Sequence, residues 1–296
     1  MKNALITLIA CTTLAACSSS SNTPITSSNL QDITIPFSAV AGDTAITCDA
    51  TLTPVGSAAG SASILNFKFY VHNVILNGDD GNDYAVTLTD SDWQDEGVAL
   101  LDFNDLSTDP DPCGGAIRET NTELTGTVNA DADVSFEGIT FSIGVPSDLN
   151  HIDISTFRDG SVLNIISMYW AWQSGHKHMR LDVDPLEGAL ANWNFHLGTT
   201  GCSGGSETEP ELVTCLRSNI PTISLDTYRQ GSDSIEFDYA QLVADTDITT
   251  TSAPASGCMS GPTDTTDCNE VFLKLGLDHS TGNAHASTMQ SAFSVQ

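Results

Sequence analysis

The chain has 296 residues and a formal net charge of −29, from 38 acidic and 9 basic side chains. With so few lysines and arginines it has no basic patch to neutralise phosphates, which excludes nucleic acid as a partner. The charge favours cations or cationic partners, although acidic surfaces are also common in proteins adapted to salty water.

The first residues have the pattern of a bacterial lipoprotein signal. A short basic start precedes an apolar run too short to span a bilayer, and small residues lead into Cys17. We expect residues 1–16 to be the signal peptide and Cys17 to carry the lipid, with an ordinary cleaved secretory signal as the alternative. Ser18 favours the outer membrane in a Gram-negative host. Residues 17–31 have little to bury and are expected to form a flexible tether ahead of a single domain over residues 32–296.

The rest of the chain is predicted to be all-β. Many short runs alternate between apolar and polar residues and are separated by Gly, Asp, Pro and Asn turns, which predicts an antiparallel β-sandwich or barrel-like domain with disulfide-stapled loops. Helical periodicity is weak and limited to residues 208–216 and 270–277. The predicted strands are residues 33–40, 65–74, 85–89, 97–102, 134–143, 163–172, 177–183, 192–197 and 234–242.

The cysteines indicate export to an oxidising compartment. Of eight, Cys11 leaves with the signal and Cys17 takes the lipid. An even number of the remainder predicts three disulfides. Proximity favours two local bridges and one long-range bridge, while thiolate metal ligands, the alternative, lack a close Cys-x-x-Cys pair. The expected pairs are Cys202–Cys215, Cys258–Cys268 and Cys48–Cys113.

One segment of the chain combines tryptophans and histidines. Indole is readily oxidised, and neutral imidazole is a common ligand for copper and zinc. The segment therefore indicates metal or redox chemistry, with an aromatic strand in an ordinary core as the alternative. In a strand over residues 163–172, Met168 and both tryptophans of that strand would share one face. The residues concerned are Trp170, Trp172, His176, His178, Trp193 and His196.

Other candidate ligands lie outside this segment. His72 is on the predicted strand at residues 65–74, where a histidine is more often a surface or core residue than a ligand. His279 and His285 near the end of the chain offer a loose copper site, although a solvated tail is the simpler interpretation. Met259 offers a thioether, although a single methionine is more often packing.

Five blocks of the sequence carry a resemblance to a known family: residues 69–74, 170–177, 195–202, 257–262 and 272–277, with Cys268. They resemble the MbnP family of periplasmic copper-binding proteins. Taken together the blocks are specific and span nearly the whole exported chain, although none is diagnostic alone. The resemblance implies a β-rich copper protein paired with MbnH, a dihaem enzyme of the bacterial cytochrome c peroxidase type, which oxidises a tryptophan to kynurenine. The similar MopE and CorA proteins use two histidines plus kynurenine.

For this chain the resemblance implies that His72 and His196 supply imidazoles to copper. One tryptophan would be the kynurenine precursor, with Trp172 preferred to Trp170 and Trp193 the weakest candidate. His176 stands where the family is expected to have tyrosine, so it is either an extra ligand or a surface residue. Kynurenine offers an arylamine nitrogen, and a low-coordinate nitrogen site suits Cu(I) better than hard cations.

Two other classes of function are weighed against copper binding. A surface lipoprotein that binds carbohydrate or protein through its aromatic cluster is the main alternative, and it has no reason to compete with a Cu(I) chelator. An enzyme is the least favoured class, because the sequence has neither a Gly-x-Ser-x-Gly nor a His-Glu-x-x-His motif. We therefore expect no turnover by the protein itself.

Overall fold

The computed structural model describes residues 29–104, 113, 120–206, 208–252 and 254–296. The expected signal peptide, Cys17 and most of the expected tether lie outside the described residues. The first strand begins at residue 30, just before the expected domain boundary at residue 32.

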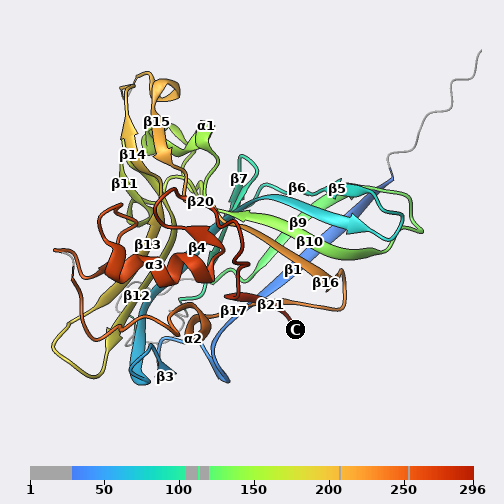
Figure 1. Ribbon diagram of the computed structural model, residues 1–296. Coiled ribbons are helices and arrows are strands. Elements are labelled where there is room, and N and C mark those ends of the chain that lie inside the picture. The colour runs from blue at the N-terminus through green and yellow to red at the C-terminus, as the bar shows by residue number, and fades with distance from the viewer. Residues whose placement is uncertain (1–28, 105–112, 114–119, 207, 253) are drawn as a thin grey trace, which may run out of the picture.

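The smaller of the two large sheets has six strands and includes both ends of the described chain (Figure 1). They are β1 (Leu30–Ala41), β2 (Thr44–Ala45), β6 (Thr87–Leu88), β9 (Glu123–Asn129), β17 (Ile235–Asp238) and β21 (Phe293–Val295). The order is β21-β17-β1-β9-β6, with β2 also on β1. β1 pairs antiparallel with β9 and parallel with β17.

The larger sheet has eleven strands and carries most of the candidate ligands. They are β3 (Thr51–Val55), β4 (Gly60–Gly78), β5 (Asp83–Ala85), β7 (Gln94–Asp95), β8 (Val98–Asp102), β10 (Phe136–Ile143), β11 (Tyr169–Ala171), β12 (Gly175–Pro185), β13 (Trp193–Gly198), β16 (Thr222–Arg229) and β18 (Gly257–Cys258). The main order is β16-β10-β4-β12-β13-β18. The long strand β4 is the centre of this sheet, since β3, β5 and β8 also pair with it.

Two hairpins and several short helices complete the described fold. The hairpins are β14 (Thr200–Ser203) with β15 (Thr214–Arg217), and β19 (Leu277–Asp278) with β20 (Asn283–Ala284). The α-helices are α1 (Ser147–Asn150), α2 (Tyr239–Leu242) and α3 (Thr265–Lys274), and the 3₁₀ helices are Ile154–Thr156, Ile166–Met168 and Pro210–Leu212. In Figure 1, β14, β15 and α1 lie together at the top of the view. Within the described residues, no helix is long and apolar enough to cross a membrane.

Aromatic side chains from both sheets form the main core. Phe37 of β1 packs against Phe69 of β4, with ring centroids 6.3 Å apart, and against Phe141 of β10 at 5.6 Å. Phe67 of β4 packs against Phe237 of β17 at 4.7 Å. These contacts confirm the predicted all-β, sandwich-like domain.

The other face of β4 is also covered, by a smaller apolar cluster that includes Tyr70, Leu100 and Met168. Because successive strand residues point to opposite faces, Phe67 and Phe69 enter the main core while Tyr70 enters the smaller cluster. His72 lies on the same side as Tyr70.

Several predicted elements were wrong. Residues 163–172 form a 3₁₀ turn followed by the short β11. Met168, Trp170 and Trp172 therefore do not share the face of one strand. Residues 234–242 divide into β17 and α2, because the Asp238 carboxylate accepts from the backbone N–H groups of Ala240 and Gln241 and starts a helix. Residues 208–216 contain one 3₁₀ turn and then β15, not a helix.

The three predicted disulfides are confirmed: Cys48–Cys113, Cys202–Cys215 and Cys258–Cys268. Cys202 and Cys215 are directly opposite each other in the β14–β15 hairpin. Cys258 and Cys268 join β18 to α3 inside the main core.

Candidate metal centre

A polar face of the larger sheet runs across β4, β12 and β13, on the side opposite the main core. Leu181 of β12 enters the main core, so the alternation of the strand turns Arg180 and Asp182 to the other side. His196 of β13 is paired with Arg180 in the strand register, and its ring contacts Asp182. This face therefore carries one of the two expected imidazole ligands.

His196 is held by a carboxylate at one ring nitrogen and keeps the other available. Nε2 of His196 lies 2.6 Å from Oδ1 of Asp182, and the Arg180 guanidinium lies 2.7 Å from Oδ2. Burial raises the pKa of Asp182, but the hydrogen bonds from His196 and Arg180 and the guanidinium charge outweigh burial and hold that pKa below its ordinary value. Because Nε2–H donates, Nδ1 carries the lone pair, and it has no hydrogen-bond partner among the described residues. A carboxylate behind an imidazole commonly orients a metal-binding histidine.

The strand beside β13 brings a thioether to the same face. β18 runs parallel to β13 with Cys258 opposite Phe195, and both residues lie in the main core. One residue further along, Met259 therefore lies beside His196 and faces the same way. The hydroxyl of Ser260 donates to the carbonyl of His196 at 2.9 Å, which fixes this stretch against β13.

The indole of Trp170 packs on β13 close to His196. Gly198 shares the face of His196, and a Cβ at Gly198 would lie only 2.5 Å from Cζ3 of Trp170. A glycine at this position therefore leaves room for the ring against the strand. The Lys177 ammonium lies 5.8 Å from the ring centroid, and burial lowers the pKa of Lys177 to about 8. These contacts place Trp170 on β13 at Gly198, two residues from His196.

A cavity of about 480 Å³ opens beside the Trp170 ring. The Met259 side chain lines the same cavity, so the thioether and the indole face a common space that is open to solvent. The lining residues are Trp170, Gln173, Ser174, Thr199, Thr200, Gly201, Cys202 and Met259.

His72 offers a second neutral imidazole, on β4. Nδ1 of His72 lies 2.8 Å from the carbonyl oxygen of Gly144, so Nδ1–H donates and Nε2 keeps a lone pair without a partner in the part of the chain that the structure describes. Burial lowers the pKa of His72, against the opposing effects of the Gly144 carbonyl and the Asp148 charge. Gly144 has φ of +130°, and a Cβ there would lie 2.6 Å from the ring of His178.

The strand register separates His72 from His196. Lys68 of β4, Arg180 of β12 and His196 of β13 form one cross-strand row, and His72 lies four residues beyond Lys68. With about 3.3 Å per residue and 4.8 Å between strands, the Cα atoms of His72 and His196 are about 16 Å apart. An imidazole nitrogen lies within about 5 Å of its own Cα, and two nitrogens on one ion are within about 4 Å of each other. This separation is larger than a single ion bridges, so the copper site proposed below uses His196 without His72.

His176 has no free ring nitrogen. Its ring is fully buried, with Nδ1 3.1 Å from the carbonyl oxygen of Asn150 and Nε2 3.0 Å from that of Leu163. The neighbouring His178 is also buried, since its Nδ1 accepts from the N–H of Val145 and its Nε2–H donates to the carbonyl of Ser218. His176 is thus neither the extra ligand nor the surface residue that the sequence suggested; both rings tie loops to β12.

The other two tryptophans lie in different surroundings from Trp170. Trp172 is half-buried in the turn before β12, and its backbone carbonyl accepts from Nδ1–H of His151 at 3.0 Å. Trp193 is fully buried in the main core, where its Nε1–H has no partner among the described residues.

The two histidines near the end of the chain do not form a joint site. His279 is buried, with Nδ1 2.9 Å from Oδ1 of Asn269 and Nε2 2.9 Å from the carbonyl of Gly261, so it is not part of a solvated tail. His285 is partly exposed, and its Nδ1 accepts from the N–H of Thr288 at 2.9 Å.

Sequence reasoning missed two residues of these sites. Asp182 lies two residues after Arg180, so a strand at this point places both side chains on one face. Its contact with His196, however, depends on which strands are neighbours. His151 has no sequence signal, since it follows a one-turn helix in a loop and meets Trp172 and Cys215 only in the fold.

Comparisons with known proteins agree with this fold. The MbnP family profile matches residues 30–260. Among solved structures, the chain is similar to MbnP from Methylosinus trichosporium, with 28% sequence identity and a TM-score of 0.78, over 90% of this chain and 98% of that one. No curated protein matches the chain.

Proposed function

The chain belongs to the MbnP family, and from this premise we propose that it is a copper-binding protein whose ion is held by Nδ1 of His196 and the thioether of Met259. The observation that carries the proposal is the position of Met259, which directly follows β18 and lines the Trp170 cavity, beside His196 on β13.

The donor set fits copper in its reduced state. A thioether is a soft ligand that selects Cu(I), and an imidazole backed by a carboxylate is a preorganised and basic one. The nearby Asp182 carboxylate is engaged by His196 and Arg180 and is therefore not a free oxygen ligand. The acidic exterior raises the local concentration of cations without supplying the specific ligands.

Trp170 is the proposed kynurenine precursor, in place of the expected Trp172. Oxidative cleavage of its pyrrole ring by two peroxides gives N-formylkynurenine and two waters, and hydrolysis then releases formate and an arylamine. Trp170 packs on Gly198, two residues from His196, so a turn of the modified side chain would bring the arylamine to the copper site as a third ligand. The cavity leaves the indole within reach of a docked oxidant, whereas Trp193 is sealed in the core.

The oxidant would be a dihaem enzyme of the MbnH type, and the protein itself would have no turnover. We also propose that it is a lipoprotein, cleaved after residue 16 and anchored through Cys17 to the outer membrane, where it faces the periplasm or the surface. The signal pattern and the three disulfides support an exported protein. Replacing Cys17 by alanine should release the mature protein from the membrane fraction.

A competition titration with a chromogenic Cu(I) chelator tests the copper proposal. Wild type and His72→Ala should remove one equivalent of Cu(I) from the chelator, whereas His196→Ala should compete much more weakly. Loss of binding in His72→Ala alone would move the site to β4. Tandem mass spectrometry of protein made with the dihaem partner should find one carbon lost and one oxygen gained at Trp170.

Carbohydrate binding remains the second candidate, because one wall of the cavity is an indole and the others carry Gln173, Ser174 and Thr199. A sugar ligand would stack on Trp170 and hydrogen-bond these polar groups. A protein that binds a sugar in this cavity but fails the chelator competition would support this second function.

A further inference from the structure

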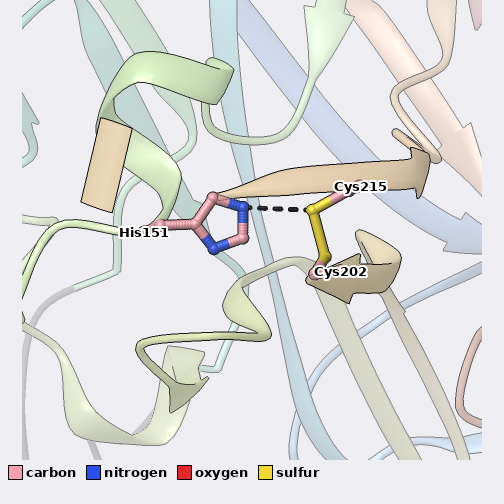
Figure 2. Close-up of side chains that lie close together, drawn as sticks. All are labelled: His151, Cys202 and Cys215. Carbon is pink, nitrogen blue, oxygen red and sulfur yellow. Dashed lines mark hydrogen bonds between the residues drawn. A yellow bond between two sulfur atoms is a disulfide. The ribbon is translucent and has the colours of Figure 1, made fainter. Parts of the chain in front are cut away.

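The Cys202–Cys215 disulfide has a histidine as its neighbour. Nε2 of His151 lies 3.3 Å from Sγ of Cys215, and Figure 2 shows the imidazole pointing at the bridge. The ligand atoms of His151, Cys202 and Cys215 all lie within 4.8 Å of one another. While the bridge is closed neither sulfur is a thiolate, so the cluster offers a cation only the imidazole.

The backbone holds the two sulfurs together independently of the bridge. Cys202 faces Cys215 directly across the β14–β15 hairpin, and the pairs Thr200 with Arg217 and Ser203 with Thr214 flank them. Directly opposite residues have Cβ atoms about 4.5–5.5 Å apart. After reduction the hairpin would therefore still present both thiols to one point.

The spacing of the three groups suits a tetrahedral cation. With metal–sulfur bonds of about 2.3 Å and metal–nitrogen bonds of about 2.0 Å, a tetrahedral site places nitrogen and sulfur about 3.5 Å apart. The observed 3.3 Å between His151 and Cys215 is already close to that separation.

The orientation of His151 is fixed from behind. Its Nδ1–H donates to the carbonyl of Trp172 at 3.0 Å, so the Nε2 lone pair faces the sulfur. The amide of Asn150 lies 3.4 Å from the same Nε2, and its second contact, 2.9 Å to Oγ1 of Thr199, remains when a cation takes that lone pair. Burial lowers the pKa of His151, which keeps the imidazole neutral.

This bridge is also the more accessible of the two local ones. Cys202 and Cys215 are partly exposed on a hairpin that belongs to neither large sheet, and Cys202 lines the Trp170 cavity. Cys258 and Cys268 are both fully buried in the main core. An external thiol therefore reaches Cys202–Cys215 without unfolding the domain.

We propose that reduction of Cys202–Cys215 opens a second metal site, in which both thiolates and Nε2 of His151 bind one thiophilic d¹⁰ cation, Zn²⁺ or Cu(I). An external dithiol supplies two electrons and two protons and becomes a disulfide itself. The cation then displaces the two thiol protons, and its remaining position faces the cavity. This inference does not depend on copper at His196, and the His196→Ala variant separates the two.

Mild dithiol treatment of the folded protein, followed by thiol counting and gel filtration, is the first step of the test. Two thiols should appear, and peptide mapping should assign them to Cys202 and Cys215. Zn²⁺ alone and Cu(I) alone are then titrated into separate samples, with Co²⁺ as the optical probe of thiolate coordination. The reduced protein should bind one equivalent with thiolate-to-cobalt charge-transfer absorption, and the untreated protein should show no such absorption. The Zn²⁺ and Cu(I) arms, run on reduced His196→Ala protein so that the site at His196 takes up no Cu(I), decide which cation the cysteine site prefers.

His151→Ala should still release two thiols but bind the cation more weakly by over 10-fold, because even indirect supports of a ligand are worth 10–100-fold in affinity. His285→Ala is the matched control, with a histidine removed outside the cluster, and should bind normally. Reduction of Cys258–Cys268 first, free thiols without charge-transfer absorption, or unchanged affinity in His151→Ala would each overturn the proposal. The comparison of treated with untreated wild type needs no cysteine substitution, so misfolding of a variant does not affect it.

Discussion

Replacing Asp182 by asparagine should weaken both the fold and the copper site. The Asp182 side chain is 7% exposed and accepts hydrogen bonds from His196 and Arg180. A hydrogen bond to a charged group contributes about 1.5–3 kcal/mol, and removing one partner of a buried ion pair costs about 3–5 kcal/mol. The Arg180 side chain is 25% exposed and regains some hydration, and an asparagine oxygen still accepts one bond. We therefore expect the free energy of unfolding to fall by about 2–3 kcal/mol.

The same substitution removes the carboxylate that orients His196, so the affinity for Cu(I) should fall by about 10–100-fold. Chemical denaturation and chelator competition measure the two effects. Asp184→Asn is the matched control, because it makes the same charge change on the same strand and the same face. Equal stability and equal affinity in the two variants would refute the role assigned to Asp182.

The pH dependence of stability gives a further check on Asp182. Its pKa is lower in the folded protein than the value of about 3.9 in an unfolded chain. Its ionised form therefore stabilises the fold above about pH 4, and this contribution is lost as the pH falls through the folded pKa. Wild type should lose stability in acid more steeply than Asp182→Asn.

Three other substitutions test separate parts of the account. Burial lowers the pKa of His178 to about 3, so the neutral ring stabilises the fold above pH 6.5 and this contribution is lost between about pH 6.5 and 3. Over that range the free energy of unfolding of His178→Gln should change less with pH than that of wild type. Equal changes in the two proteins would contradict the assignment. Gly198→Ala should displace the Trp170 ring, cost about 1–3 kcal/mol and increase acrylamide quenching of fluorescence, whereas unchanged quenching would show that the ring does not pack there. Met259→Leu conserves volume and should cost less than about 1.5 kcal/mol while weakening Cu(I) binding; retention of full affinity would exclude the thioether.

The fold was largely predictable because its signals are local. Alternating runs became β1, β4, β10, β12 and β13, and the two closely spaced cysteine pairs formed hairpin or loop bridges. The wrong predictions lie where a helix cap or a turn interrupts the alternation of apolar and polar residues. Asp238 caps a helix inside an apparent strand, and the run ending at Trp172 turns through a 3₁₀ helix before β11.

The site was predictable as a set of residue types but not as an arrangement. His196 and Met259 meet because β18 pairs in parallel with β13, and no local pattern specifies that neighbour. His72 looked equivalent to His196 in sequence. In the sheet, however, β12 lies between their two strands, and His72 is four residues beyond the row that contains His196. His151 became relevant only through its contact with Cys215.

X-ray absorption at the copper K-edge, on the singly loaded protein, identifies the atoms that bind copper. The proposed site predicts a reduced copper with both a nitrogen and a sulfur scatterer in its first shell, and loss of the sulfur scatterer in Met259→Leu. A first shell made only of nitrogen and oxygen in wild type, unchanged by that substitution, would contradict a copper site at His196 and Met259.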